Sequence, residues 1–199
     1  MFRSQPAEDE RRRRFEALAF PQMNALYNLA LRLMRHRFDA EDLVQETCLR
    51  AFRSFDQFAA GSNFKAWIFR ILTNVFINEY RRKKRVPPQV DFEKNLHSVP
   101  SVDDEGPDPF ATARDEQRYA DLFGDEVSAA LQKLSPEFRM VVLLCDLEEF
   151  SYKEIAGILG VPIGTVMSRL SRARRQLQQH LGEYARRTGA IKPQKPLQE

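Results

Sequence analysis

Residues 151–180 read SYKEIAGILGVPIGTVMSRLSRARRQLQQH, a pattern that predicts two helices joined by a tight turn. Ser151 and Glu154 have the spacing of a capping box, which marks the start of the first helix. Gly160 is suited to the left-handed backbone that ends a helix, and Pro162 is suited to the start of the next one. The stretch therefore predicts a helix-turn-helix unit, whose second helix is free to enter the major groove of DNA.

The second helix of this unit, expected to run to about Leu181, separates into two faces at about 100° per residue. The apolar face, expected to pack on the first helix through Ile155, Ile158 and Leu159, consists of Ile163, Val166, Leu170, Ala173 and Leu177. The opposite face and its flanks carry the candidate DNA-contacting residues Gly164, Thr165, Ser168, Arg169, Ser171, Arg172 and Arg175.

A polar outer face alone is weak evidence, because any surface helix has one. Here the charge is also unbalanced, since residues 167–187 contain six arginines against one glutamate. Small hydroxyl and glycine residues near the helix start permit close approach to base edges, and the arginines suit phosphates. These features together favour a helix that reads DNA.

The bulk composition excludes several protein classes. The chain has 199 residues, 43% hydrophobic and 30% charged, which fits one large or two small globular domains. No apolar run reaches the ~18 residues of a membrane span, and the first twenty residues lack the apolar core of a secretion signal. We therefore expect a cytoplasmic protein.

Metal, disulfide and catalytic chemistry find no support in the sequence. Cys48 and Cys145 lie far apart, outside any CxxC or Cys/His pattern, and the three histidines are scattered. Nucleophile-elbow, phosphate-loop and zinc-protease motifs are also absent from the sequence. We expect no metal, no cofactor and no enzymatic activity, with each cysteine filling a small apolar position on a helix.

Apolar residues recur at helical spacing in two blocks of the chain. In the first, helices are expected to begin at Pro21, with Asp39 as an N-cap, and after Asn63, the last ending in RRKKR. In the second, Ser135 is expected to cap a helix that begins at Pro136. Between them, residues 89–109 hold one lysine against six acids and several prolines, which is typical of a flexible linker.

The sequence thus predicts an all-α protein of two small helical domains joined by a flexible acidic linker. The expected ranges are a flexible N-terminus at 1–12, a first domain at 13–88, the linker at 89–112, a second domain at 113–184 and a flexible tail at 185–199.

The third helix of the first domain has a second candidate nucleic-acid surface. Arg70, Asn74 and Asn78 recur along one face, and the preceding loop, FDQFAAGSNFK at 55–65, is rich in phenylalanine. Side-chain amides and guanidiniums discriminate exposed base edges, and aromatic rings stack on unpaired bases. A loop of this kind is suited to hold a base extruded from the duplex.

Three stretches in order carry a specific resemblance: DAEDLVQETCLRAFRSFDQF (39–58), FKAWIFRILTNVFINEYRRKKR (64–85) and LSPEFRMVVLLCDLEEFSYKEIAGILGVPIGTVMSRLSRARRQL (134–177). The chain resembles a bacterial sigma factor of the sigma-70 family, most closely the extracytoplasmic-function group, which keeps only sigma domains 2 and 4. The resemblance covers residues 13–88 and 113–182. It implies binding to core RNA polymerase, recognition of the −35 and −10 promoter elements, and help in melting DNA.

The resemblance also implies roles for individual residues. Those that match the helix docking on the clamp coiled coil of the largest polymerase subunit are Asp42, Val44, Gln45 and Glu46. Those that match the −10 site are Phe58, Ser62, Asn63, Phe64, Lys65, Trp67, Arg70, Asn74, Asn78, Arg81 and Arg82. Those that match the −35 site are Gly164, Thr165, Met167, Ser168, Arg169, Ser171, Arg172 and Arg175.

The implied partners are core RNA polymerase, including the flap of the second-largest subunit, and promoter DNA, duplex at −35 and single-stranded at −10. An anti-sigma factor is a further expected partner. A stand-alone helix-turn-helix regulator remains the main alternative, but it leaves DLVQE and the asparagine helix without a purpose. A nucleic-acid enzyme would need clustered acids or metal ligands that the sequence does not contain.

Overall fold

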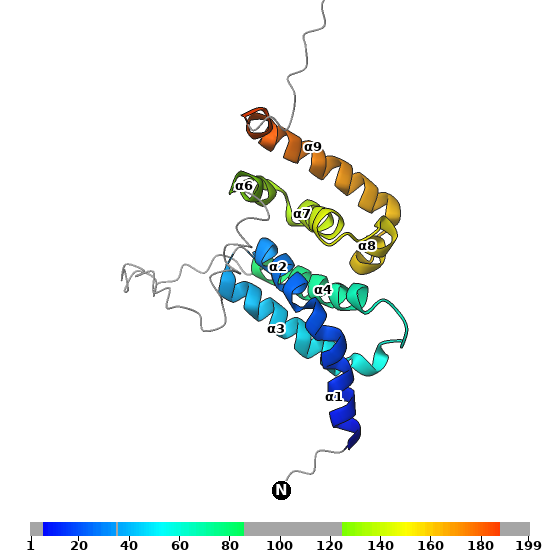
Figure 1. The fold of residues 1–199 in the computed structure, drawn as a ribbon. Helices are drawn as coiled ribbons and strands as arrows, with labels where there is room; N and C mark the ends of the chain where they lie inside the picture. The colour runs from blue at the N-terminus through cyan, green and yellow to red at the C-terminus, as the bar shows by residue number, and fades with distance from the viewer. Residues whose placement is uncertain (1–5, 35, 86–124, 188–199) are drawn as a thin grey trace, which may run out of the picture.

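The computed structural model describes residues 6–34, 36–85 and 125–187, and the regular elements in these ranges are all helical (Figure 1). The predicted all-α class is confirmed for this part of the chain. The acidic linker expected at 89–112 and most of the C-terminal tail lie outside the described residues.

The chain enters the first helical unit earlier than the sequence indicates. Helix α1 spans Pro6–Ala19, so most of the N-terminus expected to be flexible, residues 1–12, is helical. The physical reason is an anchor that reaches forward in the chain: the buried Phe15 ring lies 5.3 Å from the rings of both Phe52 and Phe55. Arg11 adds a hydrogen bond of 3.0 Å to the carboxylate of Asp56.

A 3₁₀ turn, η1 (Phe20–Gln22), contains Pro21 and leads into α2 (Met23–Met34). Helix α3 spans Arg37–Arg53 and has His36, not Asp39, at the N-cap position. The N-cap prediction at Asp39 is therefore wrong. Asp39 lies inside the first turn, where its negative charge is favourable beside the helix N-terminus.

After the 3₁₀ turn η2 (Phe55–Gln57), helix α4 spans Phe64–Arg85. The predicted start is confirmed, because the Asn63 side-chain oxygen accepts a hydrogen bond of 3.0 Å from the Ala66 backbone N–H. Helices α2, α3 and α4 enclose one apolar core. Its fully buried side chains include Leu26, Leu29, Leu43, Ile68, Phe69 and Leu72.

The second unit contains α6 (Asp125–Lys133), α7 (Pro136–Val142), the π-helical segment η4 (Leu143–Leu147), α8 (Tyr152–Leu159) and α9 (Ile163–Arg187). Its predicted signals are confirmed: Ser135 caps α7, and Ser151 and Glu154 form a reciprocal capping box. Gly160 ends α8 with a φ of 63°. Helix α9 runs about one and a half turns beyond the expected end, Leu181.

Arg139 of α7 joins three segments from the interior. Its side chain is buried and donates to the carbonyl oxygens of Leu131 and Leu134 at 2.9 and 3.1 Å, at the end of α6. A longer bond of 3.5 Å reaches the Leu33 carbonyl near the end of α2. Carbonyls at helix C-termini carry partial negative charge, which compensates the buried guanidinium.

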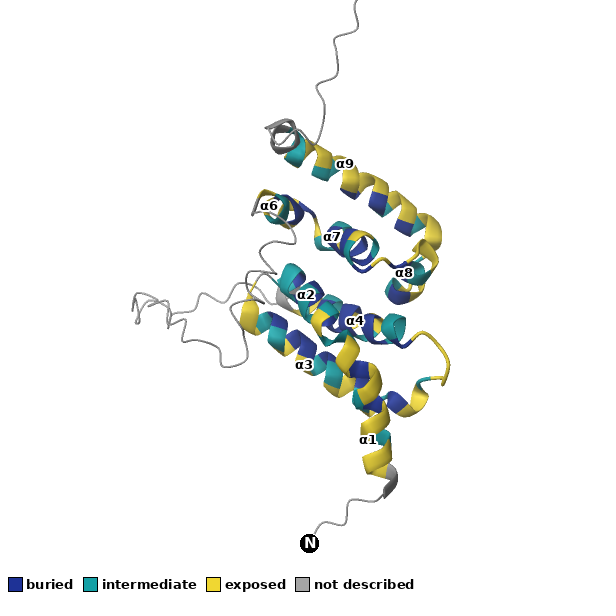
Figure 2. Cartoon of the chain, viewed as in Figure 1, coloured by how far each residue is buried: buried dark blue, intermediate teal, exposed yellow. Residues whose placement is uncertain are grey.

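The two units pack on each other. Figure 1 shows α7 and α8 lying over α2 and α4, and α4 packs directly against α8. Buried residues, dark blue in Figure 2, line the facing sides of these helices as well as the interior of each unit. The linker pattern in the sequence predicts two domains but not this contact between them.

Candidate nucleic-acid interface

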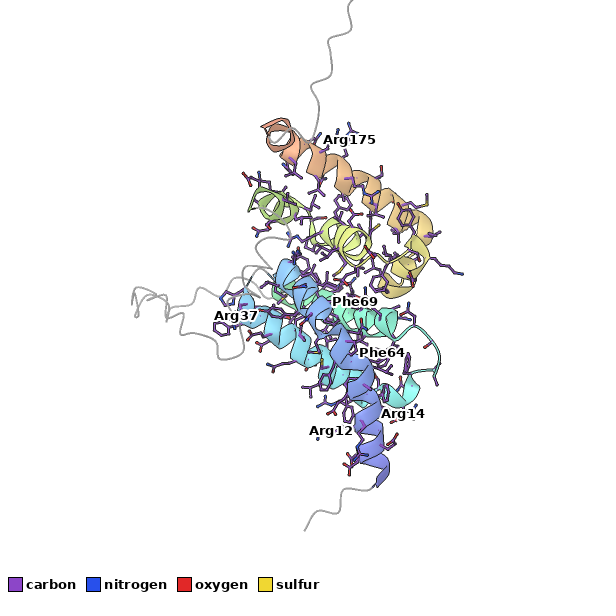
Figure 3. All side chains as sticks on the ribbon, viewed as in Figure 1. Arg12, Arg14, Arg37, Phe64, Phe69 and Arg175 are labelled. Carbon is purple, nitrogen blue, oxygen red and sulfur yellow. The ribbon has the colours of Figure 1, made fainter. Side chains whose placement is uncertain are left out.

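Helix α9 has the two faces that the sequence predicts. Val166, Leu170 and Ala173 are buried against the rest of the second unit. The outer positions Gly164, Ser168, Ser171, Arg172 and Arg175 are exposed, and Figure 3 shows Arg175 directed away from the other helices. Small residues at its N-terminal end and guanidiniums farther along suit base edges and phosphates, respectively.

Ile163 does not lie on the apolar face as expected. It is 49% exposed, because it is the first residue of α9 and extends beyond the reach of α8. Met167, one turn later, is 53% exposed. These two side chains add an apolar element to the outer face, of the kind that contacts thymine methyl groups. Helical periodicity alone misplaced Ile163; its position next to the turn was the available signal.

Two arginines of α9 are paired with neighbouring segments. Arg169 lies 3.7 Å from the carboxylate of Glu137 in α7, and Arg174 donates to Asp146 of η4 at 2.6 Å. The hydrogen bond to Asp146 raises the pKa of Arg174, which stays protonated. Both pairs fix the direction of α9 relative to the unit that carries it.

The stripe on α4 is fully presented to solvent. Arg70, Asn74 and Asn78 are all exposed and stand one helical turn apart, and Arg81 and Arg82 continue the exposed surface. Within the described residues, the side-chain polar groups of Arg70, Asn74 and Asn78 have no protein hydrogen-bond partner. Their donors and acceptors are available to an external ligand.

The loop before α4 is supported by a cluster of aromatic rings. The rings of Phe58 and Phe64 lie 5.3 Å apart, and each lies within 5.4 Å of Trp67. Phe64 is 7% exposed and also contacts Phe15 and Phe55, so it supports the loop from inside. The predicted contact between Phe64 and DNA does not fit this burial; Phe58 and Trp67 keep partly exposed rings.

The turn in this loop is tight. Ser62 donates from its hydroxyl to the Ala59 carbonyl at 2.7 Å, and Gly61 has a φ of 84°. A left-handed backbone favours glycine at that position. The loop therefore has a defined shape between the rings of Phe58 and Phe64.

Asn63 and Lys65, two further candidates, contact the second unit. The Asn63 amide nitrogen donates to the Glu154 carboxylate at 2.9 Å. The Lys65 ammonium donates to the Glu148 backbone carbonyl at 2.9 Å and lies 3.2 Å from its carboxylate. Burial raises the pKa of Glu148, and Lys65 opposes that shift. Glu148 was not singled out from the sequence, because no local pattern marks a partner 83 residues away.

On α3, the candidate polymerase-binding residues divide by exposure. Asp42 and Gln45 are exposed, and the partly exposed Glu46 accepts a hydrogen bond of 2.6 Å from Arg50. Val44 is 5% exposed and belongs to the core, so a side-chain contact from Val44 to a partner is excluded. The α3 surface is thus acidic and polar, with Val44 supporting it from beneath.

The described residues contain no helix long and apolar enough to cross a membrane. In the same ranges, His, Cys, Asp and Glu side chains form no group of three that could hold a metal ion.

Comparisons with known proteins agree with this arrangement. Residues 22–86 match the family model for sigma-70 region 2, and residues 124–177 match that for sigma-70 region 4. The chain is 40% identical to the ECF RNA polymerase sigma factor SigE of Mycolicibacterium smegmatis, over 87% of this chain and 64% of that protein. It is 37% identical to the sigma factor EcfG of Rhodopseudomonas palustris, over 80% of this chain and 78% of that protein.

Solved structures show the same likeness. The sigma factor RpoE of Bartonella quintana, solved with the anti-sigma factor NepR, has a TM-score of 0.63 and 33% identity, covering 84% of this chain and 96% of that one. CnrH, solved with the cytosolic domain of CnrY, has a TM-score of 0.60 and 26% identity, covering 86% and 90%. With both sigma-70 regions matched in order and relatives above 35% identity, the chain belongs to the extracytoplasmic-function (ECF) group of RNA polymerase sigma factors.

Proposed function

We propose that this chain acts as an RNA polymerase sigma factor that binds core polymerase, recognises promoter DNA and helps open it. Membership of the ECF group supports RNA polymerase and promoter DNA as its partners. The acidic surface of α3, through Asp42, Gln45 and Glu46, is proposed to dock on the clamp coiled coil of the largest polymerase subunit. The second unit is proposed to contact the flap of the second-largest subunit.

The two DNA surfaces have different proposed ligands. The outer face of α9 fits duplex DNA at −35, because small side chains and arginines alternate on a helix free to enter the groove. The α4 stripe fits the single-stranded −10 element, because amides discriminate bases only when the base edges are exposed. Phe58 and Trp67 offer partly exposed rings for stacking beside it.

The observation that carries the proposal is the exposed α4 stripe of Arg70, Asn74 and Asn78 beside the aromatic loop. A duplex-binding repressor has no use for a surface of this kind. The proposed role is non-enzymatic, since the polymerase itself performs the chemistry. An anti-sigma factor is a further proposed partner, because similar sigma factors were solved with such proteins.

The direct test is run-off transcription with purified core polymerase, with and without this chain, combined with permanganate mapping of melted thymines. We expect promoter-specific transcripts and melting only in the presence of the chain. Failure of the wild-type holoenzyme to melt any promoter, together with tight duplex binding by the chain alone, would favour a stand-alone regulator.

Asn74→Ala then tests the −10 surface. The exposed amide contributes little to folding, so the variant should keep its helicity and its binding to core polymerase. We expect weaker melting or an altered base preference across a panel of −10 substitutions, because one base-reading contact is worth about 1–3 kcal/mol. Gln22→Ala, which removes an amide from η1 at the opposite end of the unit, serves as the control. Unchanged melting and unchanged preference would remove Asn74 from the site.

A further inference from the structure

The second helical unit covers part of the surface proposed to contact the −10 element. The covering residues belong to the connection between η4 and α8 and to the first turn of α8. They lie against the N-terminal end of α4, as the position of α8 in Figure 1 shows. The contact therefore joins the helix-turn-helix unit to the start of the candidate single-strand site.

Lys65 is held entirely by groups of the second unit and by a ring of its own helix. Its ammonium donates to the Glu148 carbonyl at 2.9 Å, lies 3.2 Å from the Glu148 carboxylate and stands 4.8 Å from the centre of the Phe150 ring. The Glu148 side chain is only 5% exposed. A lysine bound in this way has little capacity left for a DNA phosphate.

Asn63 is occupied in a similar way. Its amide nitrogen donates to the Glu154 carboxylate at 2.9 Å, while Glu154 also completes the capping box of α8. Carboxylate oxygens and phosphate oxygens are both anionic acceptors for ammonium and amide donors. Glu148 and Glu154 thus present to Lys65 and Asn63 the same chemistry that a nucleic-acid backbone would.

Apolar packing and an uncommon backbone support the contact. Phe150 and Phe69 are both buried, and their rings meet edge to face at 5.2 Å. Glu149, between Glu148 and Phe150, has a φ of 59°, a conformation that non-glycine residues adopt rarely. This turn directs the side chains on both sides of Glu149 into the contact with α4.

We propose that the chain has a closed conformation in which Glu148 and Glu154 occupy groups that would otherwise bind the −10 strand, so that packing of the two units and binding of single-stranded −10 DNA exclude each other. The DNA half of this inference rests on the proposed function. The packing half does not.

Glu148→Lys is the primary test variant, because it places a third cation beside Lys65 and Arg32 and should separate the units. We expect a larger radius of gyration in small-angle X-ray scattering. We also expect tighter binding, by fluorescence anisotropy, of a short labelled non-template strand from a promoter that supports run-off transcription. If one wild-type molecule in ten is open, complete opening raises the apparent affinity about tenfold.

Glu149→Lys is the matched control. It makes the same change of charge one residue away, at an exposed side chain that makes no ion pair in the described structure. It should leave the radius of gyration unchanged and raise affinity only by the general effect of added positive charge. The difference between the two variants measures opening alone.

A charge swap keeps the test valid if Glu148→Lys perturbs folding. Lys65→Glu lies in the first turn of α4, where an acid suits the helix N-terminus, and it should also extend the molecule. Combining Lys65→Glu with Glu148→Lys should restore much of the compact shape. Circular dichroism checks that each variant remains helical.

Compact scattering by both single variants would overturn the closed conformation as described. Extended variants whose affinity for the strand matches that of Glu149→Lys would overturn the mutual exclusion. Extended variants, with no strand binding by any variant and no promoter melting by the holoenzyme, would instead refute the proposed function and the exclusion while leaving the packing contact in place.

Discussion

Gly160 shows how much depends on one residue of the helix-turn-helix. Its φ of 63° lies in the left-handed region, and a Cβ added there would meet nothing within 4 Å. A substitution at Gly160 is therefore disfavoured by backbone conformation alone. Gly157, three residues earlier in α8, also has open space around it but keeps an ordinary helical backbone.

The two glycines predict opposite effects of the same substitution. Gly160→Ala should lower the free energy of unfolding by about 1 kcal/mol, because alanine is strained in the left-handed region. Gly157→Ala should raise it by about 0.5–1 kcal/mol, because alanine is the better helix former. Urea unfolding monitored by circular dichroism measures both changes. Equal effects of the two substitutions would contradict the left-handed turn at Gly160.

At the scale of the element, α3 divides its work between two faces. Val44 packs into the core, while Asp42 and Glu46 stand on the outer surface. The buried face holds the helix in place, so the outer face can change its charge without loss of fold. This separation allows binding to be tested apart from folding.

Asp42→Lys combined with Glu46→Lys should abolish or strongly weaken co-elution with core polymerase on size exclusion. The reason is that two attractive charges facing a basic partner become repulsive, which costs several kcal/mol at an interface. Helicity should remain, with only the weak surface pair between Glu46 and Arg50 lost. Glu10→Lys combined with Glu149→Lys, an equal charge change at exposed sites elsewhere, should co-elute normally. Normal co-elution of the α3 variant would refute the docking proposal.

Elements that follow local chemistry were predictable from the sequence. Asn63, Ser135 and the Ser151–Glu154 box all act through atoms within three residues of the cap, so their patterns identify helix starts directly. Helix α1 was not predicted, because nine of its fourteen residues are charged or proline and its stability comes from Phe15 reaching a distant ring cluster. The π-helical η4 likewise lacks a local signature.

At the scale of the molecule, the packing of the two units lies beyond sequence reasoning. The candidate surfaces on α4 and α9 could be predicted because their residues share one helix face. The contacts of Lys65 with Glu148 and Asn63 with Glu154 span 83 and 91 residues, and only the assembled fold brings them together. The burial of Phe64 and Val44 was missed for the same reason.

The packed arrangement should respond to pH through Glu148. Burial raises the pKa of its carboxyl above the ordinary 4.5, even with Lys65 and Arg32 nearby and despite only a small further contribution from Glu149. A carboxyl with a raised pKa binds its proton more tightly in the packed state than in the unfolded chain. Packing is therefore favoured as the pH falls through the raised pKa toward 4.5, and that gain is lost as the pH rises.

Glu148→Gln isolates this contribution, because it has a nearly identical shape and no titrating proton. The difference in melting temperature between wild type and Glu148→Gln should shrink as the pH falls from about 7 to about 5. We expect the glutamine variant to be at least as stable at neutral pH, since replacing a buried carboxylate relieves its desolvation. A difference that is constant across this range would contradict the raised pKa.

The ring cluster beneath the loop also makes the protein its own optical probe. Trp67 is the only tryptophan of the chain, and its indole touches Phe55, Phe58 and Phe64 while remaining partly exposed. Emission excited selectively from tryptophan therefore comes from one place, the edge of the candidate −10 pocket. A nucleobase that stacks there would quench this emission directly. Occupancy of the pocket can thus be followed in real time, in unlabelled protein, as a promoter opens.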